Sequence, residues 1–534
     1  MTDHPADLGE TRHTARIPDH SSLWGYVSQW RHQQPDEEAI VFEGKRSTWT
    51  ELAASVETLV KSLRDCGVRR GDRIAMLSWQ CPEFVITYLA LERLGATFVG
   101  LSPRYKLPEL AFLLQDARPR VVLISASLGD GLSGSSVAGE LRENHPYVKT
   151  IVAMHGMFEG AIAFDELLVG KTDHSSSAPE PVGGACSQWL GEEEPPICIV
   201  YTSGSSGQPK AARLPNRSLL HNYRVGAELF YHKPFRTYNC HPIDHVGGID
   251  RLYQTIMLGG VLVLDQRFEP ERVLEQTEAE RLTYWLGEAT QYIKLAPLFS
   301  SFDLSSLQVV RYVGPLPEEV LKALHQIAPV VMTSYGSSET CASLVFTDES
   351  TSLEALRDGN VGRPIEGFVM RVVDTDRNRI VGDVGELEVK SEWIFGGYGT
   401  ETNAPKAPLT EDGWFRTGDL FKENGDGSFT IVGRVNDVYK SGGYDVHPTE
   451  VEAVLMAHPR VKIACVIGVP DSTFITVGRA FVVFQSAVDT EQLREFLRER
   501  LAGYKVPKEI VVLEQMPLLR NDKVDKNKLK HLEG

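Results

Sequence analysis

The stretch that most constrains this chain joins an apolar run to a loop of glycines and hydroxyl residues. Residues 197–200 read ICIV, and the sequence continues YTSGSSGQPKAAR as far as Arg213. The apolar run predicts a short buried strand, and the small residues that follow it allow backbone N–H groups to curl around an anion. The hydroxyl groups add hydrogen-bond donors and Lys210 adds a positive charge. The loop therefore favours a polyphosphate ligand.

A flexible Ser/Gly linker has a similar composition, so a linker is the alternative to a phosphate-binding loop. Two features favour a ligand loop: the predicted strand runs directly into it, and an amphipathic stretch begins at Ser218. The loop does not match the nucleotide-triphosphatase pattern G-x-x-x-x-G-K-[ST], because Lys210 lies three residues after Gly207 and is followed by Ala211.

Length and composition exclude several classes of protein. The 534 residues predict a large domain and at least one more. A net charge of −17 argues against nucleic acid or an anionic membrane as the main partner. The seven cysteines are scattered without C-x-x-C pairs, which favours reduced thiols in a cytoplasm. No apolar run is long enough to predict an integral membrane segment or a signal peptide, and residues 1–20 are predicted to be disordered.

Alternating helical and extended patterns predict an α/β fold. Strands are expected at 74–77, 97–101 and 121–124, with a helix capped by Thr50 and a second helix from Pro82 to Leu94. This alternation is typical of βαβ units and a parallel sheet. Residues 129–139 and 171–196 are rich in turn-forming residues and are predicted to be surface loops.

The loop YTSGSSGQPK resembles the phosphate loop of the adenylate-forming superfamily, which includes acyl-CoA synthetases, adenylation domains and luciferases. The family wording is close to TSGTTGxPKG, and this chain differs at Ser205, Ser206 and Ala211. The resemblance implies that the ATP phosphates are bound by Thr202, Ser203, Gly204, Ser205, Ser206, Gly207 and Lys210.

Two further motifs imply contacts with adenine and magnesium. Gly314-Pro315 resembles the family's GGAPL turn, which packs against adenine, with one small residue missing. Residues 335–339, YGSSE, resemble the family's YGxTE. By this resemblance Tyr335 offers a ring face to adenine, Ser338 a hydroxyl to the α-phosphate, and Glu339 a carboxylate to Mg²⁺.

The segment GWFRTGDL matches the family's WxxTGDL and implies that Asp419 accepts both ribose hydroxyls. The sequence from 433 to 452 resembles GRxDDxIKxxGxxIxPxEIE, in which Arg434 reaches the ribose or phosphates and Asn436 stands at the hinge position, usually Asp or Lys. Residues 441–443 would line the pantetheine tunnel; they are Ser441, Gly442 and Gly443.

Near the end of the chain, residues 517–526 resemble PxTxNGKVDR, which puts Lys523 in the place of the catalytic lysine and Asp522 in the place of a glycine. His245, before Gly-Gly, matches a histidine that the family places beside the acyl pocket and the thiol tunnel. The segment from 396 to 398 is also similar to a family segment, and we assign it no chemical role.

Asp250 and Arg251 stand where members that activate fatty acids tend to be apolar. One interpretation is a local ion pair on a helix surface. The other is that Asp250 faces the acyl pocket and recognises a polar or amino-bearing acid, because a buried carboxylate needs a partner. Pocket residues are expected near 245–255 and 311–340, including Gly336.

Together these resemblances imply an ATP- and Mg²⁺-dependent acid–CoA ligase. The large domain would span 21–435 and a small, mobile α+β domain 437–534. The partners would be a carboxylic acid, ATP and CoA. One alternative is an adenylating enzyme that passes its adenylate to a carrier protein or another non-CoA acceptor, and a further one is a non-catalytic nucleotide-binding relative.

Overall fold

The structure is a computed structural model that describes residues 17–129, 132–169, 194–203, 209–230, 232–400, 404–441, 444–471, 475–486, 489–519 and 523–532. The predicted disorder of residues 1–20 does not extend to the end of that segment. Ile17 is buried, and its N–H donates to Glu228 Oε1 at 3.3 Å.

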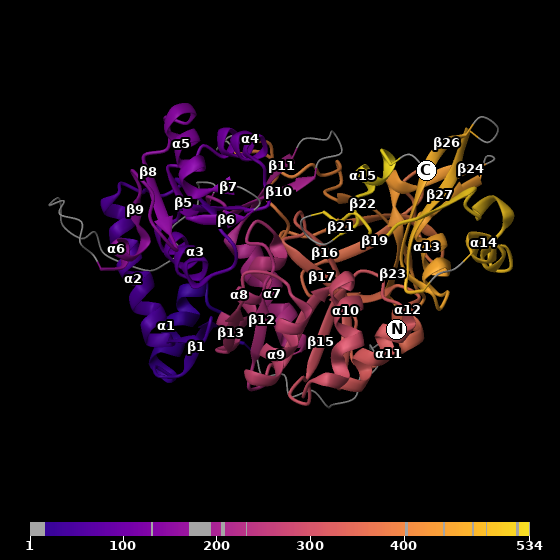
Figure 1. Ribbon diagram of the computed structural model, residues 1–534, viewed down its shortest axis with the longest axis horizontal. Coiled ribbons are helices and arrows are strands. Elements are labelled where there is room, and N and C mark those ends of the chain that lie inside the picture. The colour runs from indigo at the N-terminus through magenta and orange to yellow at the C-terminus, as the bar shows by residue number, and fades with distance from the viewer. Residues whose placement is uncertain are drawn as a thin grey trace, which may run out of the picture.

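A long sheet through the middle of the molecule begins with six parallel strands (Figure 1). In spatial order they are β1 (Glu38–Phe42), β13 (Val261–Leu264), β12 (Arg236–Asn239), β14 (Tyr284–Glu288), β15 (Val309–Val313) and β16 (Val330–Ser337). β2 (Lys45–Thr48) pairs antiparallel at one edge.

At the other edge the sheet continues with antiparallel strands. These are β17 (Ala342–Phe346), β18 (Asn360–Pro364), β23 (Phe429–Arg434), β22 (Phe415–Glu423), β21 (Val384–Lys390), β19 (Val369–Val373) and β20 (Arg379–Ile380). β22 and β23 form the hairpin whose tip the Asn-Gly and Asp-Gly pairs at 424–427 predict.

A second parallel sheet forms the N-terminal lobe. Its strands, in order, are β11 (Pro209–Leu214), β10 (Cys198–Ser203), β4 (Thr97–Leu101), β3 (Arg73–Leu77), β5 (Val121–Ser125), β8 (Thr150–Met154) and β9 (Ile162–Ala163). Only the β10–β11 pair is antiparallel in this sheet. A short hairpin, β6 (Ser127–Gly129) and β7 (Leu132–Ser133), follows β5.

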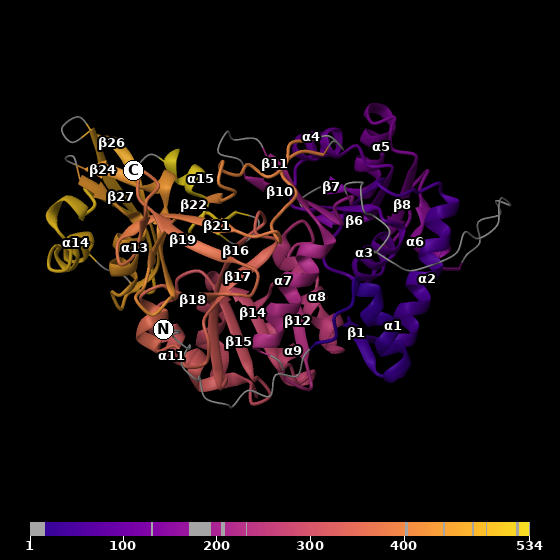
Figure 2. The same ribbon diagram turned by 180° about the vertical axis from the view of Figure 1, so that it is seen from behind.

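Helices separate and cover the two sheets (Figure 2). Side chains of α2 (Trp49–Asp65), α3 (Pro82–Leu94), α7 (Asn216–Leu229) and α8 (Val246–Leu258) form one continuous core with strands of both sheets. The remaining helices of this part are α1 (Leu23–Gln33), α4 (Leu107–Ala117), α5 (Gly134–Asn144), α6 (Phe164–Val169), α9 (Pro270–Ala279), α10 (Ala289–Leu295), α11 (Glu318–Ile327) and α12 (Leu353–Arg357).

The C-terminal part builds a separate small sheet after a single turn of 3₁₀ helix at Val435–Asp437. Its strands are β25 (Tyr444–Val446), β24 (Tyr439–Ser441), β27 (Ile475–Phe484), β26 (Val461–Asp471) and β28 (Glu509–Val512). Its helices are α13 (Pro448–Met456), α14 (Thr490–Arg498) and α15 (Lys526–Lys530). The predicted fold class, a large α/β part with a small α+β part, is confirmed.

Local signals were more reliable for some helices than for others. Pro82 opens α3 and Gly95 ends it with a positive φ of 64°, as predicted. α2 begins earlier than expected, because Thr48 and Glu51, not Thr50, form the capping box. The predicted loop at 129–139 is wrong in its second half, where α5 is capped by Ser133. The predicted loop at 171–196 lies almost wholly outside the described residues.

Among the residues that the structure describes, no helix is both long and apolar enough to cross a bilayer.

Candidate active site

The two ends of the predicted phosphate loop belong to paired antiparallel strands. β10 extends to Ser203, and β11 begins at Pro209, so Thr202 lies opposite Lys210 in the antiparallel ladder. Thr202 Oγ1 donates to the Lys210 backbone oxygen at 3.4 Å. Residues 204–208, which include Gly204, Ser205, Ser206 and Gly207, lie outside the described residues. The pairing of β10 with β11 therefore fixes where both ends of the loop stand.

Tyr398, to which we assigned no chemical role from the sequence, contacts both Lys210 and Glu339. Its hydroxyl donates to Glu339 Oε1 at 2.7 Å, and Lys210 Nζ lies 5.4 Å from the centre of its ring. Burial, and then the charge of Glu339, raise the pKa of Tyr398, so the phenol stays protonated and remains a donor. A bridge between Tyr398 and Ala212 of β11 holds this arrangement. The predicted metal ligand therefore stands beside the predicted phosphate lysine.

A second cluster forms around Asp419. Tyr335 Oη donates to Asp419 Oδ2 at 2.6 Å, and Arg434 Nε donates to Asp419 Oδ1 at 2.8 Å. Asp419 of β22 and Arg434 of β23 are direct cross-strand partners, whereas Tyr335 comes from β16. Burial and the nearby carboxylate raise the pKa of Tyr335 well above its usual value. The ring of Tyr335 packs edge-on against Phe421, with 4.7 Å between ring centres.

The remaining predicted nucleotide residues lie at the ends of β15 and β16. Gly314 follows β15 with a φ of 93°, and Pro315 comes next. Ser338 is buried in the turn after β16. Gly336 has no room for a side chain, because an added Cβ would stand 2.1 Å from the Ala342 backbone oxygen. Gly336 thus allows β16 and β17 to approach closely beside the site.

His245 and Lys523 approach one another from distant parts of the chain. His245 is the N-cap of α8 and accepts a hydrogen bond from Gly247 N at 3.0 Å through Nδ1. Burial first, and then the positive charges of Lys523 and Arg251, lower the pKa of His245 to about 4. The charge of Lys523 therefore acts on the imidazole, although the two residues are far apart in the sequence. His245 is therefore neutral at physiological pH and acts as an acceptor.

The predicted hinge and tunnel residues lie at the start of the small sheet. Asn436 is in the 3₁₀ turn, beside Asp437, whose Oδ2 pairs with Lys526 Nζ at 2.7 Å. Ser441 is buried and ends β24. Gly442, Gly443 and Asp522 lie outside the described residues.

Asp250 is neither on a helix surface nor paired with its neighbour in sequence, so the first interpretation is wrong. Its Oδ2 accepts from Arg311 Nη2 at 2.7 Å, and both side chains are almost fully buried. Burial alone would lower the pKa of Arg311, but the Asp250 carboxylate raises it. Arg251 is also fully buried and donates Nη1 to Gly247 O at 2.6 Å and Nη2 to Leu286 O. The Asp250–Arg311 ion pair links α8 to β15.

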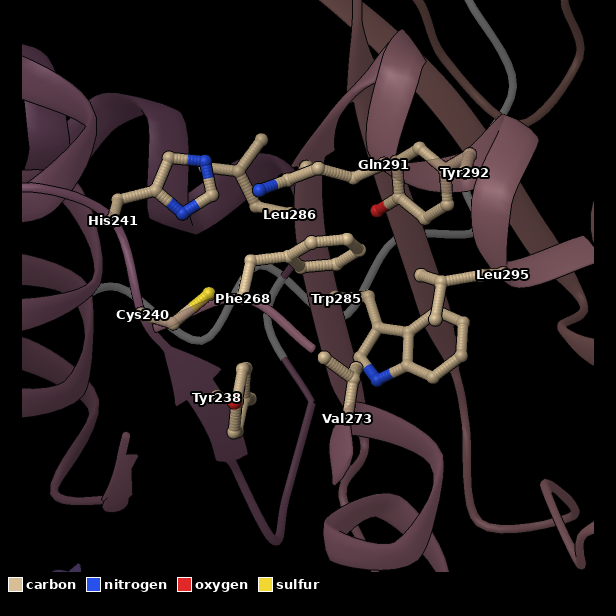
Figure 3. A pocket seen from close by; sticks show the side chains of 11 residues that line it. Tyr238, Cys240, His241, Phe268, Val273, Trp285, Leu286, Gln291, Tyr292 and Leu295 are labelled. Atoms are coloured by element: carbon tan, nitrogen blue, oxygen red, sulfur yellow. The ribbon is translucent and has the colours of Figure 1, made fainter. Parts of the chain in front are cut away.

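A small cavity opens beside these residues (Figure 3). It lies between β12, β14 and α10, and the expectation of pocket residues near 245–255 and 311–340 stays a prediction. Aromatic and aliphatic side chains dominate its wall, and three further side chains are more polar (Cys240, His241 and Gln291). The side chains that line the cavity are Tyr238, Cys240, His241, Phe268, Val273, Trp285, Leu286, Gln291, Tyr292 and Leu295. A Cβ atom on Gly247 would stand 3.2 Å from His245 Nδ1 and 3.4 Å from His241 Cδ2, so the cavity wall at His241 is next to the His245 cap.

Residues 27–399 match the family described as AMP-binding enzyme, and residues 450–523 match its C-terminal domain. The chain belongs to this family. The predicted membership of the adenylate-forming superfamily is confirmed, and with it the enzyme class, an AMP-forming ligase that uses ATP.

Three similar proteins represent the wider comparison. A feruloyl-CoA synthase from Amycolatopsis sp is 32% identical over 514 residues, covering 94% of this chain and 96% of the relative. An indoleacetate–CoA ligase from Aromatoleum aromaticum is 29% identical over 518 residues, covering 95% and 98%. The structure of the amide bond synthetase McbA from Marinactinospora thermotolerans matches with a TM-score of 0.80 at 26% identity, covering 95% and 99%.

For this AMP-binding enzyme we predict that Tyr398→Phe weakens Mg²⁺·ATP binding. The variant keeps the ring beside Lys210 and removes the hydroxyl that orients Glu339. A hydrogen bond to a charged group contributes about 1.5–3 kcal/mol, so the dissociation constant measured by calorimetry should rise about tenfold or more. Tyr147→Phe, which removes a 2.9 Å hydrogen bond to Leu114 O outside the site, is the matched control. Equal affinities for Tyr398→Phe and wild type, with and without Mg²⁺, would show that Tyr398 does not orient Glu339.

We also predict that Asp250→Asn destabilises the large domain. The isosteric change leaves Arg311 buried without its counter-charge, and breaking a buried pair in this way costs about 3–5 kcal/mol. The urea midpoint of the domain should fall accordingly. The control, Glu275→Gln, removes an exposed partner 3.6 Å from Arg272 and should cost about 1 kcal/mol or less. Equal midpoints for the two variants would contradict a structural role for the Asp250 pair.

Proposed function

We propose that the protein is an acid–CoA ligase that activates an acid with an aromatic ring. In the first step a carboxylate oxygen attacks the α-phosphorus of ATP, the bond to the bridging oxygen breaks, and pyrophosphate leaves. In the second step the CoA sulfur attacks the acyl carbon, loses its proton, and AMP leaves. The proposal is supported by two clusters built from distant segments, Lys210–Tyr398–Glu339 and Tyr335–Asp419–Arg434, which are connected through β16 and the turn that follows it.

The first step joins two anions, so the site must reduce their repulsion and align them. Lys210 supplies positive charge to the outer phosphates, and Lys523 supplies it where the carboxylate meets the α-phosphate. Asp419, already oriented by Tyr335 and Arg434, offers its remaining lone pairs to the ribose hydroxyls. Gly314 and Pro315 provide a flat wall for adenine. The hydroxyls of Thr202 and Ser338 add neutral donors to phosphate oxygens.

The residues at the predicted magnesium site fit that ion. Glu339 offers a carboxylate, the hard oxygen ligand that Mg²⁺ prefers, and Tyr398 holds one of its oxygens in place. When bound with ATP, Mg²⁺ would neutralise phosphate charge. Glu339 would hold it, and the phosphates and water would complete its coordination.

The aromatic class of acid is supported by two independent observations. Tyr238, Phe268, Trp285 and Tyr292 line the cavity beside the His245 cap, and aromatic rings attract one another beyond the area that they bury. The acids in the names of the feruloyl-CoA synthase and the indoleacetate–CoA ligase both carry an aromatic ring. The neutral His245 stands next to His241 of the cavity wall, where it adds no charge.

CoA as acceptor is supported by these two relatives, and a nitrogen acceptor is the second candidate. The amide bond synthetase has a similar fold at 26% identity, so the fold accommodates either outcome. In both cases the adenylate forms first, and only the second nucleophile differs. A carrier-protein thiol would react in the same way as CoA.

We predict that a panel of acids separates these possibilities. Aromatic acids should give kcat/KM for pyrophosphate release about tenfold or more above straight-chain acids of equal carbon number, since about 1.4 kcal/mol of ring packing is a factor of ten. With the best acid, CoA should accelerate AMP release and yield an acyl-CoA by mass spectrometry. AMP release that responds to an amine but not to CoA would reject the CoA proposal, and a preference for straight-chain acids would reject the aromatic one.

We predict that Lys523→Ala abolishes the first step. Loss of a charge aimed at the transition state costs about 100- to 1,000-fold in rate, so acid-dependent pyrophosphate release should fall by that factor. The affinity for Mg²⁺·ATP should change much less, because most nucleotide contacts remain. Lys528→Ala, on α15 five residues further on, is the charge-matched control and should keep wild-type activity. Wild-type rates in Lys523→Ala would remove this lysine from the mechanism.

A further inference from the structure

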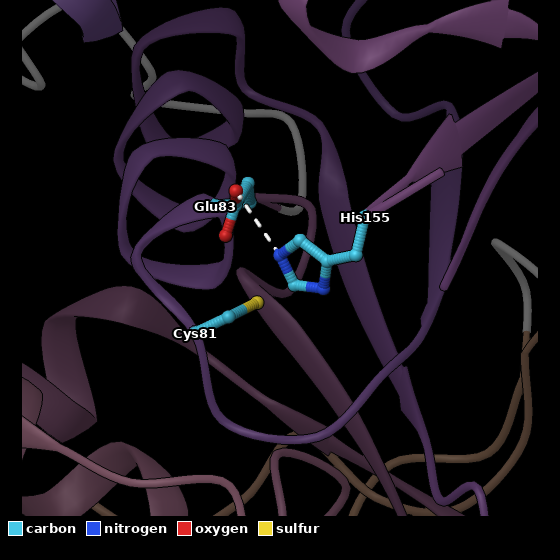
Figure 4. Close-up of side chains that lie close together, drawn as sticks. All are labelled: Cys81, Glu83 and His155. Atoms are coloured by element: carbon cyan, nitrogen blue, oxygen red, sulfur yellow. Dashed lines mark ion pairs between the residues drawn. The ribbon is translucent and has the colours of Figure 1, made fainter. Parts of the chain in front are cut away.

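A cluster of Cys81, Glu83 and His155 lies in the N-terminal lobe, apart from the residues assigned to the nucleotide (Figure 4). Cys81 is the N-cap of α3, Glu83 lies in the first turn of that helix, and His155 directly follows β8. We propose that these three side chains bind a divalent transition-metal ion of the Zn²⁺ class. Neither the reaction proposed above nor its magnesium site uses any of them.

The position is one where open α/β sheets bind ligands. α3 leads from β3 to β4 on one side, whereas the chain after β4 crosses to β5 on the other side of β3. The crevice at the carboxyl ends of β3 and β5 is therefore a switch point of the sheet, the usual location of a ligand site. Ser78 after β3 and Ser125 at the end of β5 meet there, with 2.8 Å between their hydroxyl oxygens. Ser78 Oγ is also 3.5 Å from Cys81 Sγ, so a hydroxyl stands behind the thiol as an outer-shell partner.

The distances suit a tetrahedral metal. One ligand atom from each residue lies within 4.8 Å of the other two, and the Glu83 Oε1 to His155 Nε2 distance is 3.2 Å. Zinc bonds of about 2.0–2.3 Å place neighbouring tetrahedral ligands about 3.3–3.7 Å apart. The carboxylate and imidazole already form one edge of such a tetrahedron. A side-chain rotation of the thiol completes the face, and water would take the fourth position.

An independent observation also indicates a cation. Glu83 Oε2 is buried and accepts no hydrogen bond from an N–H or O–H group of another described residue, which leaves the Cys81 thiol, a weak donor, as the group beside the carboxylate. His155 has a φ of 56°, in the left-handed region that non-glycine residues rarely adopt. Such backbone strain gathers at ligand sites, where the surrounding structure holds a side chain in position.

The ligand types select the metal. Sulfur, nitrogen and carboxylate oxygen together suit Zn²⁺ and related ions, whereas Mg²⁺ prefers oxygen alone. Thiolate and carboxylate would balance the charge of a divalent ion in this largely buried place. Cys81 is fully buried and the side chain of His155 is 34% exposed, so the ion would enter past the histidine. A bound metal would link the first turn of α3 to the end of β8.

Cobalt provides the sharpest test, because a thiolate bound to Co²⁺ gives a near-ultraviolet charge-transfer band. Full-length protein freed of metal with a chelator should bind one equivalent of Co²⁺ with that band, and Zn²⁺ should displace it. The isosteric Cys81→Ser should lose the band, and His155→Gln should weaken Zn²⁺ binding about 100-fold against a chromophoric competitor. Cys66→Ser, which removes a partly exposed thiol outside the cluster, is the control and should keep both properties.

Cys81→Ser and His155→Gln test the site independently, so the result does not depend on both variants folding. Circular dichroism and the thermal midpoint without metal check that each variant folds, and if one does not fold, the other decides the question. The proposal is overturned if wild-type protein binds less than half an equivalent, or if a folded Cys81→Ser protein keeps the band. Unchanged Zn²⁺ affinity in folded His155→Gln also overturns it, and the cluster is then only the Glu83–His155 ion pair beside a buried thiol. None of these outcomes bears on the ligase reaction, which is assayed separately with Mg²⁺·ATP.

Discussion

The parallel hydrogen bonding that joins β14, β15 and β16 brings the carboxyl ends of these strands to one edge of the sheet. Whatever side chains follow the strands must then meet, however far apart they are in the sequence. Gly314 and Tyr335 reach the same region in this way. The β10–β11 pair of the second sheet contributes Lys210, whose ammonium group lies over the ring of Tyr398. The hydroxyl of Tyr398 in turn donates to Glu339. Side chains that follow strands of the two sheets therefore bring Lys210 and Glu339, two predicted nucleotide-site residues, to the same tyrosine.

Asp419 links a side chain of the parallel strands to a side chain of the antiparallel strands. A buried carboxylate is costly unless it is paired and hydrogen-bonded. Here one oxygen accepts from Tyr335 of the parallel part, and the other accepts from Arg434, two residues before the hinge position. The orientation of the predicted ribose acceptor thus depends on both parts of the large domain. Pre-orientation of this kind reduces the reorganisation that ligand binding requires.

Much of the fold could be predicted from local sequence signals, because proline at a helix start and glycine at its end act within a few residues. α3, with Pro82 and Gly95, is the clear case. The Gly/Ser composition of 129–139 was misleading, since a serine cap and a capping box outweighed it in α5. Motifs also gave the approximate neighbourhood of Tyr335, Asp419 and Arg434. Nothing in the sequence could give Arg311 as the partner of Asp250, because that contact depends on how α8 packs against β15. Tyr398 was missed for the same reason. The two glycines directly before it, Gly396 and Gly397, were a signal that could have pointed to it.

In the proposed two-step reaction, Lys523 serves the first step and the segment after Ser441 serves the second, and both are attached to the same small sheet. The loop that carries Lys523 is held by a bridge between Leu518 and Val524, and Val524 packs against the core of β26 and β27. Ser441 pairs with Ile475 of β27. Lys526 joins this unit to Asp437, next to the hinge position, and the charges of Glu452 and Asp437 raise the pKa of Lys526 against the effect of burial. Because Ser441 and Val524 both pack on this one small sheet, the proposed rotation about Asn436 would move Lys523 and the segment after Ser441 together as one unit.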